Sequence, residues 1–384
     1  MPGSNDDLDD LDRLVSELNL AVSPAPRSAI HDGVLEGWLA RVREGGGSDL
    51  LLVSGAPPTM RIRGKLSAAS AEILDGEDVE AAVMPFVPMR LQDRYRSGEA
   101  VDLAFRLGSL GRFRMNLHRE RGRAAASIRA LPLHVPLLPD LHFTHDIAML
   151  TTLPRGLVLI GGPTGSGKTT TLAALVAEIN ARDSRHIITV EDPIEYDHPH
   201  GRCLVEQIEI GVDAPDFPSA LRAAVRQAPD VIVVGEMRDP ETMRIALSAA
   251  ETGHLVFATV HTTDVAAAVS RIADAFASER QNAVRQELAM ALAAVLTQTL
   301  VPSLAGGVVP MSELLIVSYG ARQHVRKNTL QHLNQEITIT RKLGSFTLEE
   351  SLAKLVQRGA LERKDALLRA AHPDELESLL SRVQ

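Results

Sequence analysis

Short runs of apolar residues alternate with longer mixed stretches along the second half of the chain. The clearest runs are 157–160, 186–190, 231–234 and 255–260. Strands that are covered on both faces of a parallel sheet show such continuous apolar runs, and the stretches between them are long enough for helices. The pattern predicts an α/β domain over residues 155–384, with a parallel sheet between two layers of helices.

Residues 31–142 show a different pattern, in which strand and helix signals are mixed. Helices are expected at 35–42 and 79–96, and strands at 49–54, 59–63, 111–119 and 124–131. Pro57, Pro58 and Gly122 mark turns between consecutive strands. These signals predict a smaller α+β domain, joined to the second domain by a linker at 143–154.

The first 30 residues differ from the rest in composition. They contain six acidic residues, which are Asp6, Asp7, Asp9, Asp10, Asp12 and Glu17, followed by two prolines. A dense run of like charges followed by prolines is typical of a disordered segment, within which one helical turn is possible from Leu11 to Leu20. We therefore expect a disordered acidic tail over residues 1–30.

The overall composition agrees with a soluble intracellular enzyme that has a full core. Hydrophobic residues make up 45% and charged residues 23% of the chain. We expect neither a membrane span nor a secretory signal, because no long apolar run and no basic start are present. Cys203 is the only cysteine, which excludes an internal disulfide and a zinc site built on paired cysteines. The net charge of −9 disfavours broad nucleic-acid binding.

A glycine-rich turn follows the first apolar run directly. It matches the phosphate-loop pattern G-x-x-x-x-G-K-[ST], whose glycines turn backbone N–H groups inward around phosphates at a helix N-terminus. Lys168 would reach the β- and γ-phosphates, and the Thr169 hydroxyl would hold Mg²⁺. The expected ligands are ATP and Mg²⁺, and the expected contacts are Gly162, Pro163, Thr164, Gly165, Ser166, Gly167, Lys168, Thr169 and Thr170.

Polar residues follow the other three apolar runs. Glu195 ends the sequence EDPIE, Glu236 lies in GEMRD, and His261 begins HTT. The carboxyl ends of parallel strands face the ligand crevice of such a sheet, so these three side chains are expected near the phosphate loop. Glu236 lies at the place of the usual second nucleotide motif, where Gly235 replaces the expected metal-binding aspartate.

The combination of GPTGSGKTT, TVEDPIE, VVGEMRD and ETGHLVFATVHTT resembles the secretion-type hexameric motor ATPases, the superfamily of type II secretion and type IV pilus motors. The resemblance covers residues 35–380 and is greatest to the pilus retraction, or twitching-motility, ATPases. The assembly and secretion motors typically carry a four-cysteine zinc insert, whereas this sequence has one cysteine. They also tend to carry larger N-terminal modules, for which the 30-residue acidic segment here is expected to leave no room. The resemblance implies a PAS-like first domain and a RecA-like P-loop ATPase domain, closing into a homo-hexamer.

The same resemblance implies roles for individual residues. Glu195 corresponds to the glutamate that polarises the attacking water, Glu236 to the one that helps to hold Mg²⁺ through water, and His261 to the histidine that senses the γ-phosphate. The family also supplies phosphate-facing arginines from its first domain. Their positions are occupied here by Arg114 and Arg129, one on each strand of the predicted hairpin around Gly122.

A short C-terminal segment bears on the direction of force. In the retraction family a helix reading AIRNLIRE follows the core, and the aligned residues here are 320–327. Both arginines are kept, as Arg322 and Arg326, and an i,i+4 pair shares one helix face. The expected function is an ATP-driven motor for type IV pilus retraction, cytoplasmic and held at the inner membrane by components of the pilus machine.

Three alternatives remain open. A motor for pilus extension or type II secretion would share the chemistry. A RecA-like nucleic-acid translocase is a different class, although no nucleic acid is expected because the basic hairpin lacks interleaved stacking aromatics. The third is a regulatory nucleotide-binding protein with little turnover, and the complete set of expected catalytic residues argues against it. It is also open whether a paralogous motor ATPase shares the ring.

Overall fold

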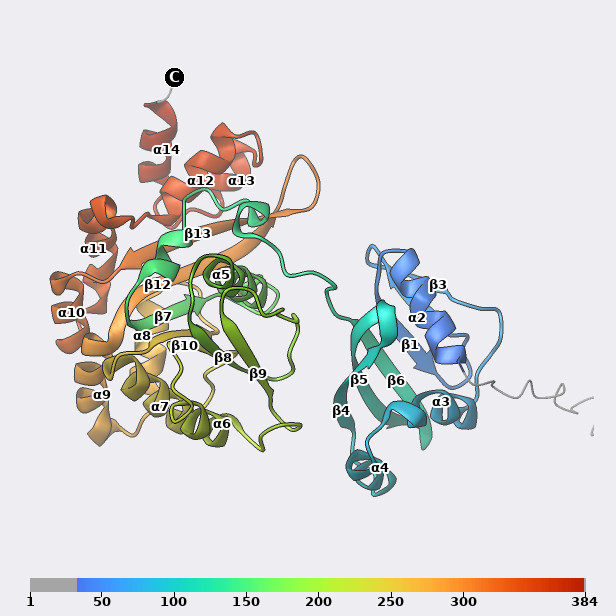
Figure 1. The fold of residues 1–384 in the computed structure, drawn as a ribbon. Coiled ribbons are helices and arrows are strands. Elements are labelled where there is room, and N and C mark those ends of the chain that lie inside the picture. Colours follow the sequence, from blue (N-terminus) through green and yellow to red (C-terminus); the bar gives the residue numbers. More distant parts are fainter. Residues whose placement is uncertain (1–32, 383–384) are drawn as a thin grey trace, which may run out of the picture. The chain divides into compact units, whose positions relative to one another are not determined.

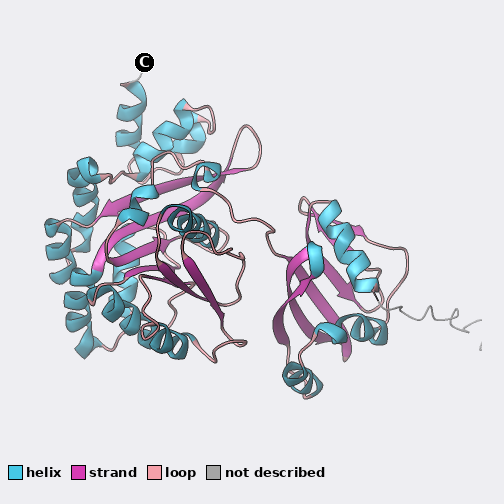
Figure 2. Ribbon diagram, viewed as in Figure 1, coloured by secondary structure: helices cyan, strands magenta, loops and turns pink. Residues whose placement is uncertain are grey.

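The computed structural model describes residues 33–382, which belong to two compact units. The chain passes from the first unit to the second between Ala130 and Leu131. Each unit has its own sheet and its own helices (Figures 1 and 2). The predicted acidic tail, residues 1–30, lies outside the part of the chain that the structure describes.

The first unit is an antiparallel sheet with helices packed on it. The strand order is β3-β2-β1-β6-β5-β4, with bounds β1 (Gly47–Val53), β2 (Thr59–Ile62), β3 (Lys65–Ala68), β4 (Val101–Leu107), β5 (Gly111–Glu120) and β6 (Arg123–Ala130). The helices are α2 (Val34–Glu44), α3 (Gly76–Val83) and α4 (Met89–Arg96), with short turns η1 (Met84–Phe86) and η2 (Gly108–Leu110). Alternate strand residues such as Leu50, Met115 and Ile128 are buried in one core with Leu39 of α2 and Val79 of α3. This alternation fits a sheet that is covered on one face.

The prediction of a single helix over 79–96 was wrong. The segment forms α3, η1 and α4 in succession. Pro85 cannot donate a backbone hydrogen bond, and Val87 is extended before Pro88, with φ −89° and ψ 117°. Proline restricts the residue before it to extended conformations, so two prolines three residues apart end one helix and start another.

The second unit is built on a mostly parallel sheet, as the apolar runs predicted. The strand order is β13-β12-β7-β11-β10-β8-β9, and β13 is the antiparallel member, paired with β12. The bounds are β7 (Gly156–Gly161), β8 (His186–Glu191), β9 (Leu204–Glu209), β10 (Val231–Val234), β11 (Leu255–Val260), β12 (Leu292–Pro302) and β13 (Val308–Ile316). The phosphate-loop strand β7 therefore lies between β11 and β12.

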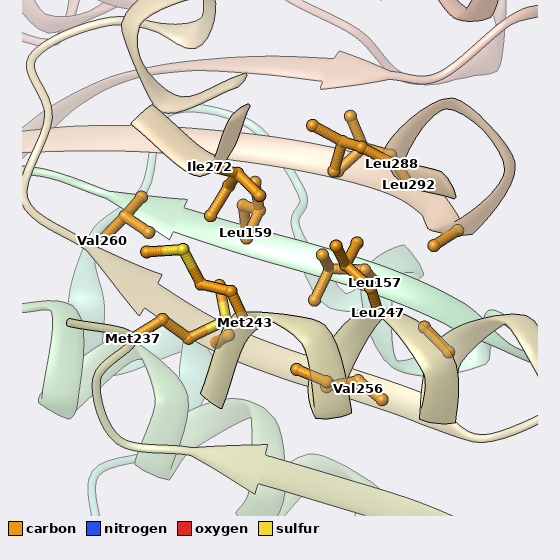
Figure 3. Packing of buried hydrophobic residues seen from close by; sticks show 14 of the residues in the cluster. Leu157, Leu159, Met237, Met243, Leu247, Val256, Val260, Ile272, Leu288 and Leu292 are labelled. Carbon is orange, nitrogen blue, oxygen red and sulfur yellow. The ribbon is translucent and has the colours of Figure 1, made fainter. Parts of the chain in front are cut away.

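Helices cover both faces of this sheet. The bounds are α5 (Lys168–Arg182), α6 (Phe217–Ala224), α7 (Pro240–Glu251), α8 (Val265–Asp274), α9 (Ser278–Ala291), α10 (Tyr319–Arg326), α11 (Leu333–Ile339), α12 (Leu348–Gln357), α13 (Arg363–Leu367) and α14 (Pro373–Ser381), with turns η3 (Leu138–Leu141), η4 (Ala148–Thr152), η5 (Leu330–His332) and η6 (Thr340–Leu343). Leu157 and Leu159 of β7 pack with Leu247 of α7 and Leu288 of α9 on one face (Figure 3). The alternate residues Val158 and Ile160 pack with α5 on the other. Within residues 33–382, no helix has both the length and the apolar character needed to cross a membrane.

The segment expected to be a linker, 143–154, instead packs on the second sheet. It contains η4, and Ile147 and Leu150 are buried in the same core as α5. Arg182 of α5 donates hydrogen bonds to both the hydroxyl and the carbonyl oxygen of Thr151. A short apolar stretch without clear periodicity resembles a linker in sequence, and here burial of its apolar side chains makes it part of the second unit.

Cys203 is buried just before β9. Its side chain is 3% exposed, and its thiol donates a hydrogen bond to the carbonyl oxygen of Asp183 at 3.1 Å. The Asn180 side chain accepts a hydrogen bond from the backbone N–H of Cys203 at 3.2 Å. The thiol is therefore enclosed between α5 and the start of β9.

Candidate functional site

The phosphate loop joins β7 to α5 through residues 162–167. Gly162 approaches its neighbours so closely that a Cβ there would overlap the carbonyl oxygen of Gln298 and the hydroxyl of Ser166. Gly167 is the N-cap of α5 and adopts the left-handed conformation, with φ 84° and ψ 18°. Only glycine adopts this conformation without strain. The two glycines of the motif thus set the path of the chain at both ends of the loop.

Lys168 directs its ammonium group into the loop. Nζ donates hydrogen bonds to the carbonyl oxygens of Gly162 at 2.8 Å and Pro163 at 3.0 Å. The residue is 8% exposed, and burial lowers the pKa of Lys168 while the negative charge of Glu236 opposes that shift. A cation in such a low-dielectric position interacts strongly with any anion that the loop accepts.

The ends of β10 and β11 place Glu236 and His261 beside Lys168. His261 lies between the two charges, with Nδ1 at 3.4 Å from Lys168 Nζ and Nε2 at 3.0 Å from Glu236 Oε1. An ammonium group can only donate, so Nδ1 accepts from Lys168 and Nε2 donates to Glu236. The arrangement selects one tautomer of the imidazole and connects the loop cation to the carboxylate.

Glu236 is ionised in this arrangement. Burial opposes ionisation, but the hydrogen bond and charge of Arg238, together with His261 and Lys168, lower the pKa of Glu236 overall. Arg238 Nη2 lies 2.7 Å from Glu236 Oε2. Both carboxylate oxygens therefore already have protein partners, which favours contact with a metal ion through water over direct ligation.

Two glutamates lie near each other at the end of β8, Glu191 as its last residue and Glu195 in the segment that follows. The buried carboxylate of Glu191 accepts hydrogen bonds from Thr189 at 2.7 Å and from Gln207 at 3.1 Å. Burial raises the pKa of Glu191, and the nearby charge of Glu195 raises it further, although the backbone N–H of Glu195 also bonds to this carboxylate. The hydrogen bonds from Thr189, Gln207 and the backbone N–H of Glu195 oppose this upward shift, because they stabilise the ionised carboxylate.

Tyr196 joins the segment that carries Glu195 to the phosphate-loop helix. Its hydroxyl lies 3.0 Å from the hydroxyl of Thr170 in the first turn of α5. Burial raises the pKa of Tyr196, so the phenol stays protonated and can donate this bond. The contact links Glu195, through its neighbour in sequence, to the helix that begins with Lys168 and Thr169.

The structure thus brings Lys168, Glu236 and His261 together and links the Glu195 segment to the first turn of α5. Sequence reasoning missed two residues that contribute here, Arg238 and Tyr196. Both lie inside or next to motifs that were already recognisable, GEMRD and EDPIE. Their participation depends on side-chain direction, which a motif alone does not specify.

Arg114 and Arg129 lie on the first unit, directly opposite each other on β5 and β6. Arg129 forms an ion pair with Asp49 at 3.0 Å, and Arg114 lies 3.7 Å from Asp102. Despite the opposing effect of burial, hydrogen bonds from Ser48 and Arg129 lower the pKa of Asp49. Each arginine therefore has a carboxylate neighbour that offsets the repulsion between two adjacent cations.

The segment aligned with the retraction helix forms α10, and Arg322 is used within the fold. Its Nη1 donates hydrogen bonds to the carbonyl oxygens of Ala289 at 2.5 Å and Met290 at 2.6 Å, in the last turn of α9. Burial and the nearby Arg326 both lower the pKa of Arg322. Arg322 thus satisfies the C-terminal carbonyls of a neighbouring helix.

Comparison with known proteins finds relatives along most of the chain. Residues 140–365 match the family described as "Type II/IV secretion system protein". The chain is 38% identical over 329 residues to the type IV pilus retraction ATPase PilT of Pseudomonas aeruginosa, covering 86% of this chain and 96% of that protein. It is also 38% identical over 320 residues to a twitching motility protein of Neisseria gonorrhoeae, covering 83% of this chain and 86% of that protein.

A solved structure is similar over nearly the whole described chain. The crystal structure of the pilus retraction motor PilT with bound ADP has a TM-score of 0.82 and 38% sequence identity to this protein, covering 90% of this chain and 99% of that one. The shared fold confirms the predicted class, a RecA-like P-loop ATPase domain with a smaller α+β, PAS-like domain. The chain therefore belongs to the type II/IV secretion system protein family, among the pilus retraction ATPases.

Proposed function

We propose that the protein hydrolyses ATP and uses the energy, as a homo-hexameric motor, to retract type IV pili. The observation that carries the proposal is the chain of contacts from Lys168 through His261 to Glu236, beside a complete phosphate loop. Phosphoryl transfer requires positioning and charge neutralisation more than covalent chemistry, and this chain supplies both. The names of the relatives, a pilus retraction ATPase and a twitching motility protein, support the choice of retraction.

In this proposal each residue has one task. Lys168 binds the β- and γ-phosphates. Its ammonium group then donates to phosphate oxygens in place of the carbonyl oxygens of Gly162 and Pro163. Glu195 orients the attacking water, and His261 responds to the γ-phosphate because its partner Lys168 does. Arg114 and Arg129 neutralise charge that develops in the transition state, a role for which the planar guanidinium is well suited.

The residues present also fit Mg²⁺. Thr169 offers a hydroxyl oxygen in the first turn of α5, and Glu236 offers a carboxylate whose oxygens are held by His261 and Arg238. Mg²⁺ prefers oxygen ligands and keeps several of its waters, so a Thr169 oxygen and a water-mediated contact to Glu236 suit it. Bound Mg²⁺ would neutralise phosphate charge in the reaction.

The proposed location is the cytoplasmic side of the inner membrane, where components of the pilus machine would hold the ring. A paralogous motor ATPase is a further candidate partner, and no nucleic acid is proposed. These assignments rest on the family and on the names of its members.

A gene deletion, complemented with wild-type protein or with Lys168→Ala, tests the proposal together with ATPase assays of the purified protein. If the protein retracts pili, the deletion strain keeps or accumulates surface pili but loses surface motility. A strain without surface pili would instead support an extension motor of the same family. ATP hydrolysis that requires nucleic acid and falls steeply with salt would support the translocase, and negligible hydrolysis would support the regulatory alternative.

A further inference from the structure

Gln298 lies where β12 reaches the level of the phosphate loop. β12 runs parallel to β7, and Thr297 pairs with Gly161, the last residue of β7. Gln298 is the next residue, so it lies level with Gly162, where the loop begins. The two backbones are in close contact, because a Cβ on Gly162 would overlap the carbonyl oxygen of Gln298.

The side-chain amide of Gln298 makes two hydrogen bonds to the loop and its helix. The residue is 3% exposed. Its Nε2 donates to the carbonyl oxygen of Ser166 at 2.7 Å, and its Oε1 accepts from the hydroxyl of Thr171 at 2.9 Å. Ser166 belongs to the loop and Thr171 to the first turn of α5, so one buried amide fastens both to the neighbouring strand.

We propose that Gln298 is a positioning residue for the nucleotide phosphates, acting through the peptide group between Ser166 and Gly167. This peptide is trans, and in a planar trans peptide the C=O and the N–H point in opposite directions. A hydrogen bond that holds the Ser166 carbonyl toward β12 therefore holds the Gly167 N–H away from β12, toward the interior of the loop. Phosphate binding by such loops depends on inward-directed N–H groups.

The loop needs such an anchor because glycine is conformationally free. Gly167 is held at φ 84°, and Gly165, which lies two residues before it, is held at φ 79°. Without an external bond these residues have many other conformations available. The apparent affinity for a ligand falls in proportion to the fraction of molecules in the competent conformation. The inference rests on the proposed function, because it assumes that the loop binds a nucleotide.

An amide is suited to this position because it donates and accepts at once. Gln298→Leu removes the hydrogen bonds to Ser166 and Thr171 while keeping a side chain of similar size. Gln298→Glu in its ionised form can accept from Thr171 but cannot donate to the Ser166 carbonyl, whereas the protonated form can donate one hydrogen bond. Burial raises the pKa of a carboxyl group, so the glutamate variant is expected to regain the donor as the pH falls.

The test is titration calorimetry of the full chain with ADP at about pH 6 and about pH 8, with each dissociation constant divided by the wild-type value at the same pH. Gln298→Leu is expected to bind about tenfold more weakly at both pH values, because a loop that has lost its anchor is partly misformed. Gln298→Glu is expected to match this loss at the higher pH and to recover at the lower pH. Thr171→Val, which keeps the Ser166 bond, is expected to lose only about threefold.

Thr297→Val is the matched control. Thr297 is 2% exposed and donates to Glu313 at 3.1 Å, and its side chain points to the face of β12 opposite to that of Gln298. The valine keeps the shape and removes one buried hydrogen bond from the same strand. Wild-type affinity is expected for this variant.

The possible results distinguish the inference from the proposed function. Wild-type ADP affinity of folded Gln298→Leu and Gln298→Glu at both pH values would overturn the positioning role. An equal loss for Gln298→Glu at pH values on either side of the pKa of its carboxyl group would also overturn it, since the donor would then not matter. If thermal melting shows that Gln298→Leu does not fold, the pH dependence of Gln298→Glu decides the question. A wild-type protein that binds neither ADP nor ATP would overturn the proposed function itself.

Discussion

Lys168 supplies the positive charge of the phosphate loop in the proposed site. Its buried ammonium group is the only cationic side chain between residues 162 and 170. Lys168→Ala is therefore expected to abolish nucleotide binding and turnover, because the phosphate charges lose their fixed counter-charge. ATP hydrolysis and ADP affinity of the purified protein are the measurements, and Lys364→Ala, an exposed position on α13, is the control. Hydrolysis near the wild-type rate in Lys168→Ala would contradict the phosphate-loop assignment.

Glu195 and Glu236 are expected to respond differently to the loss of their charge. Glu195→Gln keeps the size of the side chain but removes the carboxylate that orients water. ATP should still bind, while hydrolysis drops by at least about 10²-fold, the low end for a positioned base. Single-turnover hydrolysis and ATP affinity are measured side by side, with the exposed Glu362→Gln as control. If Glu236→Gln retains bound ATP without turnover and Glu195→Gln does not, the two roles are reversed.

Arg238 keeps Glu236 ionised, which predicts a change in the pH profile. Its hydrogen bond and charge lower the pKa of Glu236, so their removal raises that pKa. A carboxylate is lost as the pH falls through its pKa, so in Arg238→Ala the acidic decline of kcat should begin at a higher pH than in the wild type. Arg238→Lys keeps the charge and should shift the profile less. An unchanged acidic limb in Arg238→Ala would show that Glu236 does not control it.

The residues of the site were largely predictable, and their mutual contacts were not. Lys168, Glu236 and His261 could each be assigned from a motif at the end of a strand, because parallel strands end at one edge of a sheet. The hydrogen bonds of His261, Arg238 and Gln298 depend on rotamers and on the register between β12 and β7. No local sequence pattern around Gln298 predicts its contact with Ser166.

At the scale of secondary-structure elements, α10 and α9 are tied together by Arg322. Its guanidinium covers two carbonyl oxygens in the last turn of α9. Arg322→Ala should lower Tm by roughly 3–8 °C, because charge-assisted bonds to two carbonyls at the end of α9 are lost. Arg322→Lys should recover part of the loss, and thermal unfolding followed by circular dichroism is the measurement. A Tm equal to that of the wild type would mean that solvent satisfies these carbonyls equally well.

This contact changes how the predicted retraction helix is to be tested. The sequence predicted that Arg322 and Arg326 share a helix face, from which both could contact a partner. Arg322 serves the fold instead, so loss of pilus withdrawal in Arg322→Ala would combine an effect on folding with one on docking. Arg326→Ala is therefore the better variant for testing whether this helix is needed for pilus withdrawal.

Among the elements, the continuous apolar strands were the most predictable and the short or irregular segments the least. β7, β8, β10 and β11 were expected because each is a run of large apolar residues. β12 was missed, since its Ala-rich start continues the composition of the helix before it and short apolar runs are ambiguous between helix and strand. The break in the helix predicted for 79–96 was signalled by Pro85 and Pro88.

At the scale of the whole molecule, the proposed ring and the two arginines of the first unit lead to one prediction. Arg114→Ala and Arg129→Ala should each lower turnover with little loss of ATP affinity, because arginines of this kind act mainly on transition-state charge. Turnover and affinity are compared with those of Arg121→Ala, an exposed residue in the turn of the same hairpin. Sedimentation should show a closed oligomer, and six subunits is the expected number. A fully active monomer would contradict this assembly.

The buried thiol of Cys203 has a practical consequence for studying such a ring. An enclosed thiol that is hydrogen-bonded to a carbonyl is poorly accessible to solvent, so it reacts slowly with maleimides. The wild-type sequence is therefore already a suitable background for site-specific labelling. A cysteine introduced at the exposed Ser97 would be the main reactive site for a dye. Donor- and acceptor-labelled preparations, mixed with and without ATP, would then report subunit exchange by energy transfer, with no native cysteine to remove first.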